Sequence, residues 1–157
     1  MQFDWTAIAA TSAAVISIAN LTVTTYSAGR RERFKWARDS LAEAFYSFID
    51  TSYLYGSALN KCQRLLWSEG TADEIERARQ TMQAQSSMLK HAQTKIRLLA
   101  STRTLDQAQR LRTKLDHLSD VVSEDLSQQE YHLMKAEIRQ CREMLIVSAK
   151  RSMGLPR

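Results

Sequence analysis

The sequence predicts an all-α protein in which an N-terminal transmembrane helix continues into an antiparallel, up-down four-helix cytoplasmic bundle. Two observations predict helices. The 157 residues include only four glycines and one proline, and that proline is Pro156 near the end of the chain, so the turn residues that β-hairpins require are scarce. Apolar residues also recur at alternating spacings of three and four, which is the period of a helix with one buried face.

The first predicted domain, residues 1–29, contains the transmembrane helix. No charged residue occurs from Trp5 to Gly29, and roughly 20 apolar-compatible residues are enough to cross a hydrocarbon core of about 30 Å. Threonine and serine dilute the aliphatic side chains, so the hydrophobicity is moderate. Phe3, Trp5 and Tyr26 flank the segment, where interfacial aromatic residues are typical. The alternative is a buried or interfacial amphipathic helix.

A basic cluster follows this segment, so the positive-inside rule places the N-terminus outside and the C-terminus in the cytoplasm of a single-pass protein. A secretory signal peptide would instead carry its basic residues before the apolar run. We expect the basic residues next to the membrane to contact anionic lipid headgroups. They are Arg30, Arg31, Arg33, Lys35, Lys150 and Arg151.

Small and polar residues share one stripe of the predicted transmembrane helix. Such a stripe lets two helices approach closely in lipid and hydrogen-bond across the contact. The residues predicted to carry this self-association are Ala9, Ala13, Ser17, Asn20 and Thr24. A span of low hydrophobicity without a partner explains the same stripe equally well.

The second predicted domain, residues 30–157, is the helical bundle. Its first helix carries an almost unbroken three-four alternation of apolar or small residues, which is typical of a bundle seam. These residues are Phe34, Ala37, Leu41, Ala44, Phe48, Ser52, Tyr55, Leu59, Cys62 and Leu66. The helix is expected to end near Gly70, because Thr71 and Glu74 form a capping-box pattern for the next one.

Two further breaks complete the four helices. Thr104 and Gln107 suggest a capping pattern after a break at residues 101–104, and Ser127 with Glu130 opens the last helix. No glycine marks the break at residues 101–104, so one long helix there, giving a long helical hairpin or a three-helix coiled coil, remains an alternative. Short connections make neighbouring helices antiparallel, which brings the C-terminal tail back toward the membrane.

A net charge of +5 could indicate nucleic-acid binding, but the positions of the charges along the chain favour another interpretation. Residues 40–149 hold fourteen Lys/Arg and fourteen Asp/Glu, so the excess lies in residues 30–39 and in the tail. In the predicted topology, basic residues gather at the membrane side of the bundle and acidic residues at the far side. This distribution favours lipid headgroups, and no nucleic-acid partner is expected.

The sequence indicates no catalytic or cofactor site. His91, His117 and His132 fall in different predicted helices without a metal-ligand spacing, and no phosphate-binding or nucleophile motif occurs. Cys62 and Cys141 lie on apolar stripes, where cysteine packs as a small hydrophobic residue. We therefore expect no metal, no cofactor and no enzymatic activity; a deep pocket that held His117 with neighbouring carboxylates would reopen the enzymatic alternative.

Aromatic residues cover more than one face of the first bundle helix. Tyr46 and Tyr53 fall outside its apolar seam, so they are candidates for an exposed patch that contacts a partner or a second copy. Scattered exposed aromatic residues are also common without such a role.

The segment 30–39, Arg-Arg-Glu-Arg-Phe-Lys-Trp-Ala-Arg-Asp, with the following Ala-Glu-Ala-Phe-Tyr-Ser-Phe, resembles the juxtamembrane helix of small single-pass bacterial membrane proteins of unassigned function. The resemblance implies an inner-membrane location and no activity. The function expected is a membrane-anchored interaction or scaffold protein, with itself or an unidentified protein as partner besides the lipid bilayer. The alternative is a small membrane-active effector, similar to toxins or holins, that oligomerises through its polar-striped span.

Overall fold

The computed structural model describes residues 5–123 and 125–154, and the side chains of residues 5–31, 33 and 34 lie outside this description. The described residues form four α-helices and no strand. The helices are α1 (Trp5–Trp67), α2 (Ala72–Leu99), α3 (Thr102–Val121) and α4 (Gln128–Ser152). The chain divides into two compact units, Met1–Asp39 and Ser40–Arg157.

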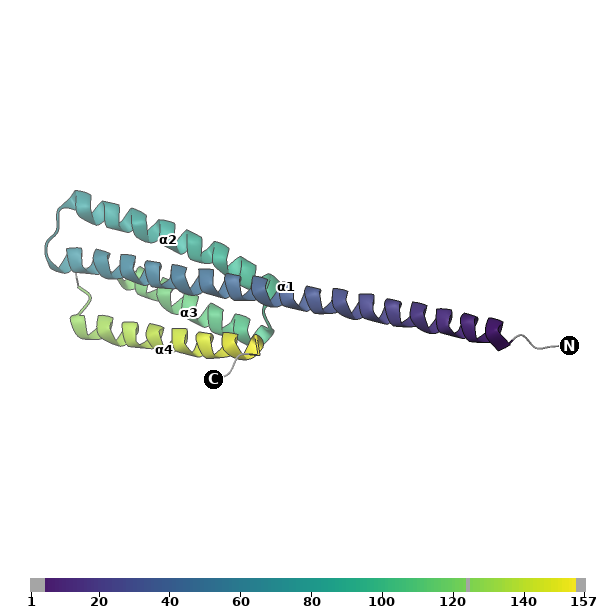
Figure 1. Ribbon diagram of the computed structural model, residues 1–157. Helices are drawn as coiled ribbons and strands as arrows, with labels where there is room; N and C mark the ends of the chain where they lie inside the picture. The colour runs from purple at the N-terminus through teal and green to yellow at the C-terminus, as the bar shows by residue number, and fades with distance from the viewer. Residues whose placement is uncertain (1–4, 124, 155–157) are drawn as a thin grey trace. The chain divides into compact units, whose positions relative to one another are not determined.

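In the second unit, the helices form the expected up-down bundle, with α2, α3 and α4 beside the C-terminal part of α1 (Figure 1). Polar contacts show that α3 and α4 are antiparallel. The hydroxyl of Thr104, at the start of α3, lies 3.0 Å from the hydroxyl of Ser148, near the end of α4. Lys114 lies further along α3 and pairs with Glu137, which is nearer the start of α4. The long hairpin, the three-helix coiled coil and the uninterrupted helix through residues 101–104 are therefore wrong.

The core confirms the seams expected from the apolar spacing. Every seam residue of α1 from Leu41 to Leu66 is buried, and Phe48, Leu59 and Cys62 are fully inaccessible to solvent. The other helices contribute buried leucine, isoleucine, alanine and tyrosine side chains: Leu89, Ala92, Ile96, Ala108, Leu111, Leu115, Leu118, Tyr131, Ile138, Leu145 and Ala149. Burial of this apolar surface is the main favourable contribution to folding.

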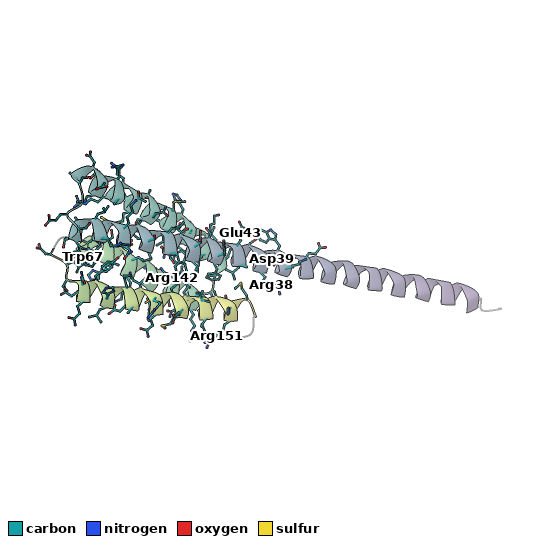
Figure 2. The ribbon with its side chains drawn as sticks, turned by 60° about the vertical axis from the view of Figure 1, so that its left-hand side comes forward. Arg38, Asp39, Glu43, Trp67, Arg142 and Arg151 are labelled. Atoms are coloured by element: carbon teal, nitrogen blue, oxygen red, sulfur yellow. The ribbon has the colours of Figure 1, made fainter. Side chains whose placement is uncertain are left out.

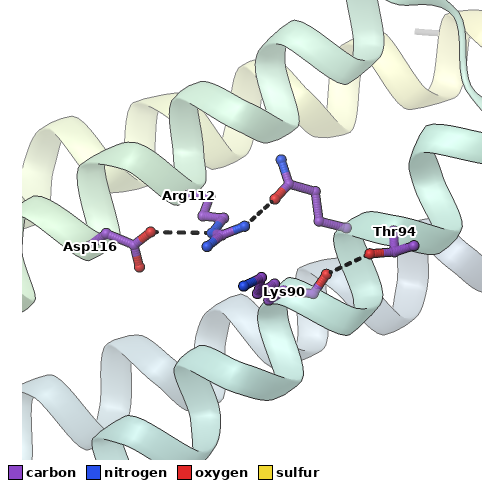
Figure 3. Close-up of polar contacts among 5 residues, drawn as sticks. Lys90, Thr94, Arg112 and Asp116 are labelled. Atoms are coloured by element: carbon purple, nitrogen blue, oxygen red, sulfur yellow. Dashed lines mark hydrogen bonds and ion pairs between the residues drawn. The ribbon is translucent and has the colours of Figure 1, made fainter.

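Arg112 of α3 supplies the polar link between α2 and α3. Its Nε donates to the Asp116 carboxylate at 3.2 Å, and its Nη1 donates to the Gln93 side-chain oxygen on α2 at 2.8 Å. Figure 3 shows Arg112 pointing from α3 toward α2, where Thr94 hydrogen-bonds the Lys90 carbonyl within its own helix. The guanidinium thus has a carboxylate partner and a neutral acceptor.

The helix starts confirm two of the three predicted caps. Thr71 with Glu74 and Ser127 with Glu130 form complete capping boxes at the first residues of α2 and α4. The pattern predicted at Thr104 and Gln107 is wrong, because α3 begins three residues earlier and has Ser101 as its N-cap. The Ser101 hydroxyl makes no cap bond and lies 3.1 Å from the hydroxyl of Thr104.

The turn after α1 has its positive φ at a residue other than the expected glycine. Glu69, not glycine, has a positive φ of 54°. Gly70 instead donates its N–H to the Leu65 carbonyl at 2.8 Å, which is the pattern of a Schellman motif. A Cβ at Gly70 would lie 3.1 Å from Leu65 Cδ2 and 3.2 Å from the Leu65 carbonyl oxygen, so glycine is needed there for close approach.

These two positions give opposite expectations for stability. Glu69→Gly should raise the free energy of unfolding by about 1 kcal/mol, because glycine adopts a positive φ without a Cβ clash. Gly70→Ala should lower it by about 1 kcal/mol, because Leu65 must move to make room. Urea denaturation of both variants beside the wild type measures the two differences.

Glu69→Ala is the matched control, since it removes the carboxylate and keeps the Cβ. Its free energy of unfolding should stay within about 0.5 kcal/mol of the wild type. If Glu69→Ala stabilised the protein as much as Glu69→Gly, charge rather than backbone conformation would explain the gain.

Candidate functional site

The predicted membrane segment has a described backbone but no described side chains. α1 begins at Trp5, so the helix expected there is present. The stripe of Ala9, Ala13, Ser17, Asn20 and Thr24 and the basic side chains of Arg30, Arg31 and Arg33 lie outside the described residues. Among the residues that the structure describes, no helix is sufficiently long and apolar to cross a membrane. The predicted transmembrane helix is therefore without structural support.

The two ends of the bundle differ in charge. One end contains the α2–α3 turn and the C-terminus of α4, and most of its exposed charged residues are basic: Lys95, Arg97, Arg103, Lys150 and Arg151, with Asp106 as an acidic neighbour. The opposite end contains the α1–α2 and α3–α4 turns, and most of its exposed charged residues are acidic: Glu69, Asp73, Glu74, Glu76, Asp120, Asp125 and Glu130, with Arg64 and Arg77 as basic neighbours. Figure 2 shows Trp67 and Arg151 at these opposite ends of the bundle. Contact of the basic end with headgroups stays a prediction.

The histidines and cysteines lie apart. His91, His117 and His132 are all exposed on three different helices, and no cluster of potential metal ligands occurs among the residues that the structure describes. Both cysteines are free, with Cys62 buried and Cys141 partly buried. Burial raises the pKa of the Cys62 thiol, and Arg79 opposes that rise. A raised pKa keeps Cys62 protonated and weakly nucleophilic.

A groove of about 490 Å³ lies between α1, α2 and α3. Asp116, Asp120 and Arg79 line it, together with the buried Tyr55. Burial raises the pKa of the Tyr55 hydroxyl. Hydrogen bonds with Ser119 and Ser86 oppose this rise. His117 does not line this groove, so the histidine and carboxylates that a general acid and base would require are not brought together there.

The outer face of α4 carries a second row of apolar residues, opposite the row that faces the core. Leu133, Met144 and Val147 are 60%, 46% and 44% exposed, and Ala136 and Gln140 lie between them. Leu133, Gln140 and Val147 follow one another at intervals of seven residues, which is the heptad spacing of a helix that packs against another helix. We call Leu133, Ala136, Gln140, Met144 and Val147 the outer row of α4.

The outer row was not predicted from the sequence, because each helix was expected to have a single apolar face. The available signal was the heptad spacing of Leu133 and Val147, offset from the buried stripe that contains Ile138 and Leu145. The predicted exposure of Tyr46 and Tyr53 on α1 is confirmed, at 75% and 54%. Their role in binding a partner stays a prediction.

The fold and this surface together define an all-helical bundle with an unpartnered apolar row on its last helix. Comparison with known proteins adds no relative: no family model, no curated protein and no solved structure matches the chain.

Substitutions in the outer row should leave the bundle intact. Met144→Glu should change the free energy of unfolding by no more than about 0.5 kcal/mol, because its side chain is on the surface. Leu145→Ala should lower it by about 2 to 5 kcal/mol, because Leu145 is fully buried. Urea denaturation of both variants tests the assignment of the two faces. A large loss in Met144→Glu would contradict an exposed outer row.

Proposed function

We propose that the protein is a membrane-anchored helical interaction protein that presents its bundle in the cytoplasm and pairs with a second copy through the outer row of α4. The observation that carries this proposal is the outer row itself. Three large apolar side chains share one exposed helix face, and a row of exposed apolar residues on one face is a candidate interaction surface.

A second copy is the partner that this row suits best. In a parallel pair of α4 helices, related by a two-fold axis, each residue of the row faces its own counterpart. Gln140 lies midway between Leu133 and Val147. Its side-chain amide both donates and accepts hydrogen bonds, so two facing amides satisfy each other, while Leu133 and Val147 supply apolar contacts on either side.

The size of the row explains why an anchor is needed. The fifteen residues from Leu133 to Val147 span about 21 Å of helix. Burying the exposed half of each large side chain contributes on the order of 1 kcal/mol, and association itself costs at least about 4 kcal/mol. Pairing in free solution is therefore weak. Confinement to a membrane raises the effective concentration of the two copies and orients them in parallel.

The charge pattern supports an anchor at the N-terminus. The helical segment from Trp5 to Gly29 has no charge, and Arg30, Arg31, Arg33 and Lys35 follow it directly. Lys150 and Arg151 end α4 on the basic end of the bundle. Each well-placed basic residue contributes about 1 kcal/mol of attraction to an anionic leaflet. In this proposal the anchor crosses a bacterial inner membrane, with the N-terminus outside and the bundle in the cytoplasm.

Cysteine crosslinking in native membranes tests the pairing. In a Cys141→Ser background, Gln140→Cys should give a disulfide-linked dimer of the full chain on mild oxidation, because the two sulfurs meet at the two-fold axis. Adding Met144→Glu should abolish the crosslink by placing like charges at the contact. The yield of dimer on a non-reducing gel is the measurement.

Thr113→Cys in the same background is the matched control, because Thr113 is also exposed but belongs to α3. It should remain uncrosslinked. A dimer yield from Thr113→Cys equal to that from Gln140→Cys would indicate random collision and would reject the pairing through α4.

The anchor and the alternative effector function are tested by expression of the full chain. We expect the protein to sediment with membranes, to resist extraction by carbonate and to leave the membrane potential of the cells unchanged. Extraction by carbonate would contradict a transmembrane anchor. If expression depolarised the cells, and a Ser17→Leu/Asn20→Leu variant did not, the effector function would replace the scaffold function.

A further inference from the structure

A groove of about 370 Å³ lies between α1 and α4, and its charged lining is entirely basic. Its lining consists of Tyr53 from α1 and His132, Lys135, Ala136, Arg139 and Arg142 from α4. The groove therefore differs from the larger one between α1, α2 and α3, where Asp116 and Asp120 balance Arg79.

Arg142 is the buried member of this lining, with 8% of its surface exposed. Its Nε donates to the Ser52 hydroxyl and its Nη2 donates to the Ser52 carbonyl, each at 3.0 Å. The guanidinium carbon lies 3.9 Å from the centre of the Tyr53 ring. These contacts fix the side chain, and Figure 2 places it between the two ends of the bundle.

All of these partners are neutral. Among the residues that the structure describes, no carboxylate lies within ion-pair distance of Arg142. Arg112 shows the contrast, because Asp116 neutralises it. Burial lowers the pKa of the Arg142 guanidinium, and Tyr53 opposes that change. Arginine nevertheless stays charged in proteins, so a positive charge is buried here without a counter-charge, which is unfavourable unless an anion completes the site.

Two exposed cations extend the site along α4. Lys135, Arg139 and Arg142 are spaced by four and three residues, so they share one helix face over about 10 Å. Lys135 Nζ already donates to the Asn60 side chain of α1 at 3.1 Å, which holds it at the groove. A phosphate group, with up to two negative charges and three acceptor oxygens, matches several cations better than a single carboxylate does.

We propose that the groove between α1 and α4 binds the phosphate group of a small soluble ester, held by Arg142 together with Lys135 and Arg139. The groove has a volume within the range of small-molecule sites. Arg142 stands nine residues before Arg151, which is about 13 Å along the helix. A lipid headgroup at the basic end of the bundle does not reach that far, so a soluble ligand is favoured. Of the outer row of α4, only Ala136 also lines this groove, and none of the three cations proposed to bind phosphate belongs to that row.

Titration of the full chain with inorganic phosphate tests the site. The protein is kept in maltoside micelles, which carry no phosphate, and chloride at equal ionic strength serves as the reference. Phosphate should shift the NMR signal of the Arg142 Nε–H group, whereas chloride should not. By calorimetry, Lys135→Gln/Arg139→Gln should bind phosphate at least tenfold more weakly. Both side chains are exposed, so the variant folds.

Arg97→Gln/Arg110→Gln is the matched control, since it removes two exposed positive charges from α2 and α3. It should bind phosphate as the wild type does. Equal weakening in both double variants would indicate general screening and would overturn the proposal. An unchanged Arg142 signal at saturating phosphate would do the same.

Two further probes separate other anions from the proposed one. The groove would be assigned to lipid if phosphatidylglycerol vesicles bound the Lys135→Gln/Arg139→Gln variant more weakly than the wild type, while inorganic phosphate had no effect on the Arg142 signal. It would be assigned to an acidic protein segment if a polyglutamate peptide bound the same variant more weakly than the wild type, again without an effect of inorganic phosphate. Either result would overturn the proposal of a soluble phosphate ester.

Discussion

The bundle depends on one continuous face of α1. Between Leu41 and Leu66, this face is buried along its whole length, and the main core cluster joins it to residues of α2, α3 and α4. The three shorter helices each bury one side against a shared interior. A charged substitution at Phe48 or Leu59 would therefore disturb several packing contacts at once, because both are fully inaccessible to solvent.

Polar contacts define where this face ends. Near the α1–α2 turn, Gln63 donates to the Ser123 carbonyl at 2.8 Å, and the Trp67 indole donates to the Leu126 carbonyl at 2.9 Å. The Trp67 ring also meets Tyr131 edge to face, with 5.3 Å between ring centres. These contacts satisfy carbonyls of the α3–α4 connection, which would otherwise lack helical partners. They hold that connection against the last turns of α1.

Much of this fold could be predicted from the spacing of apolar residues alone. Seams such as Leu41 to Leu66 follow from helical periodicity, and the capping boxes at Thr71 and Ser127 follow from side-chain chemistry that acts within four residues. The start of α3 was missed because several hydroxyl residues adjoin there, and local sequence does not decide which one precedes the helix. The positive φ at Glu69 was missed because that conformation is usually expected at glycine.

The candidate sites were less predictable, because they depend on how helices meet. Arg142 carries a charge, and charged residues are almost always exposed, so apolar spacing assigns it to the surface. The structure buries it because it lies beside the core stripe of Ile138 and Leu145 and opposite Ser52, a small polar member of the α1 seam. The outer row of α4 required the same knowledge, namely which face of the helix the core already occupies.

The contact between Arg142 and Ser52 also has a consequence for the alignment of α4 along α1. Apolar seams of similar side chains tolerate a slip by one helical turn, about 5.4 Å, because leucine and alanine find comparable neighbours after the shift. The Ser52 hydroxyl and carbonyl are the acceptors that hold the guanidinium at 3.0 Å, and a slip would move the charge among apolar groups. One polar pair therefore selects a single register from several that hydrophobic burial alone would leave nearly equal in energy.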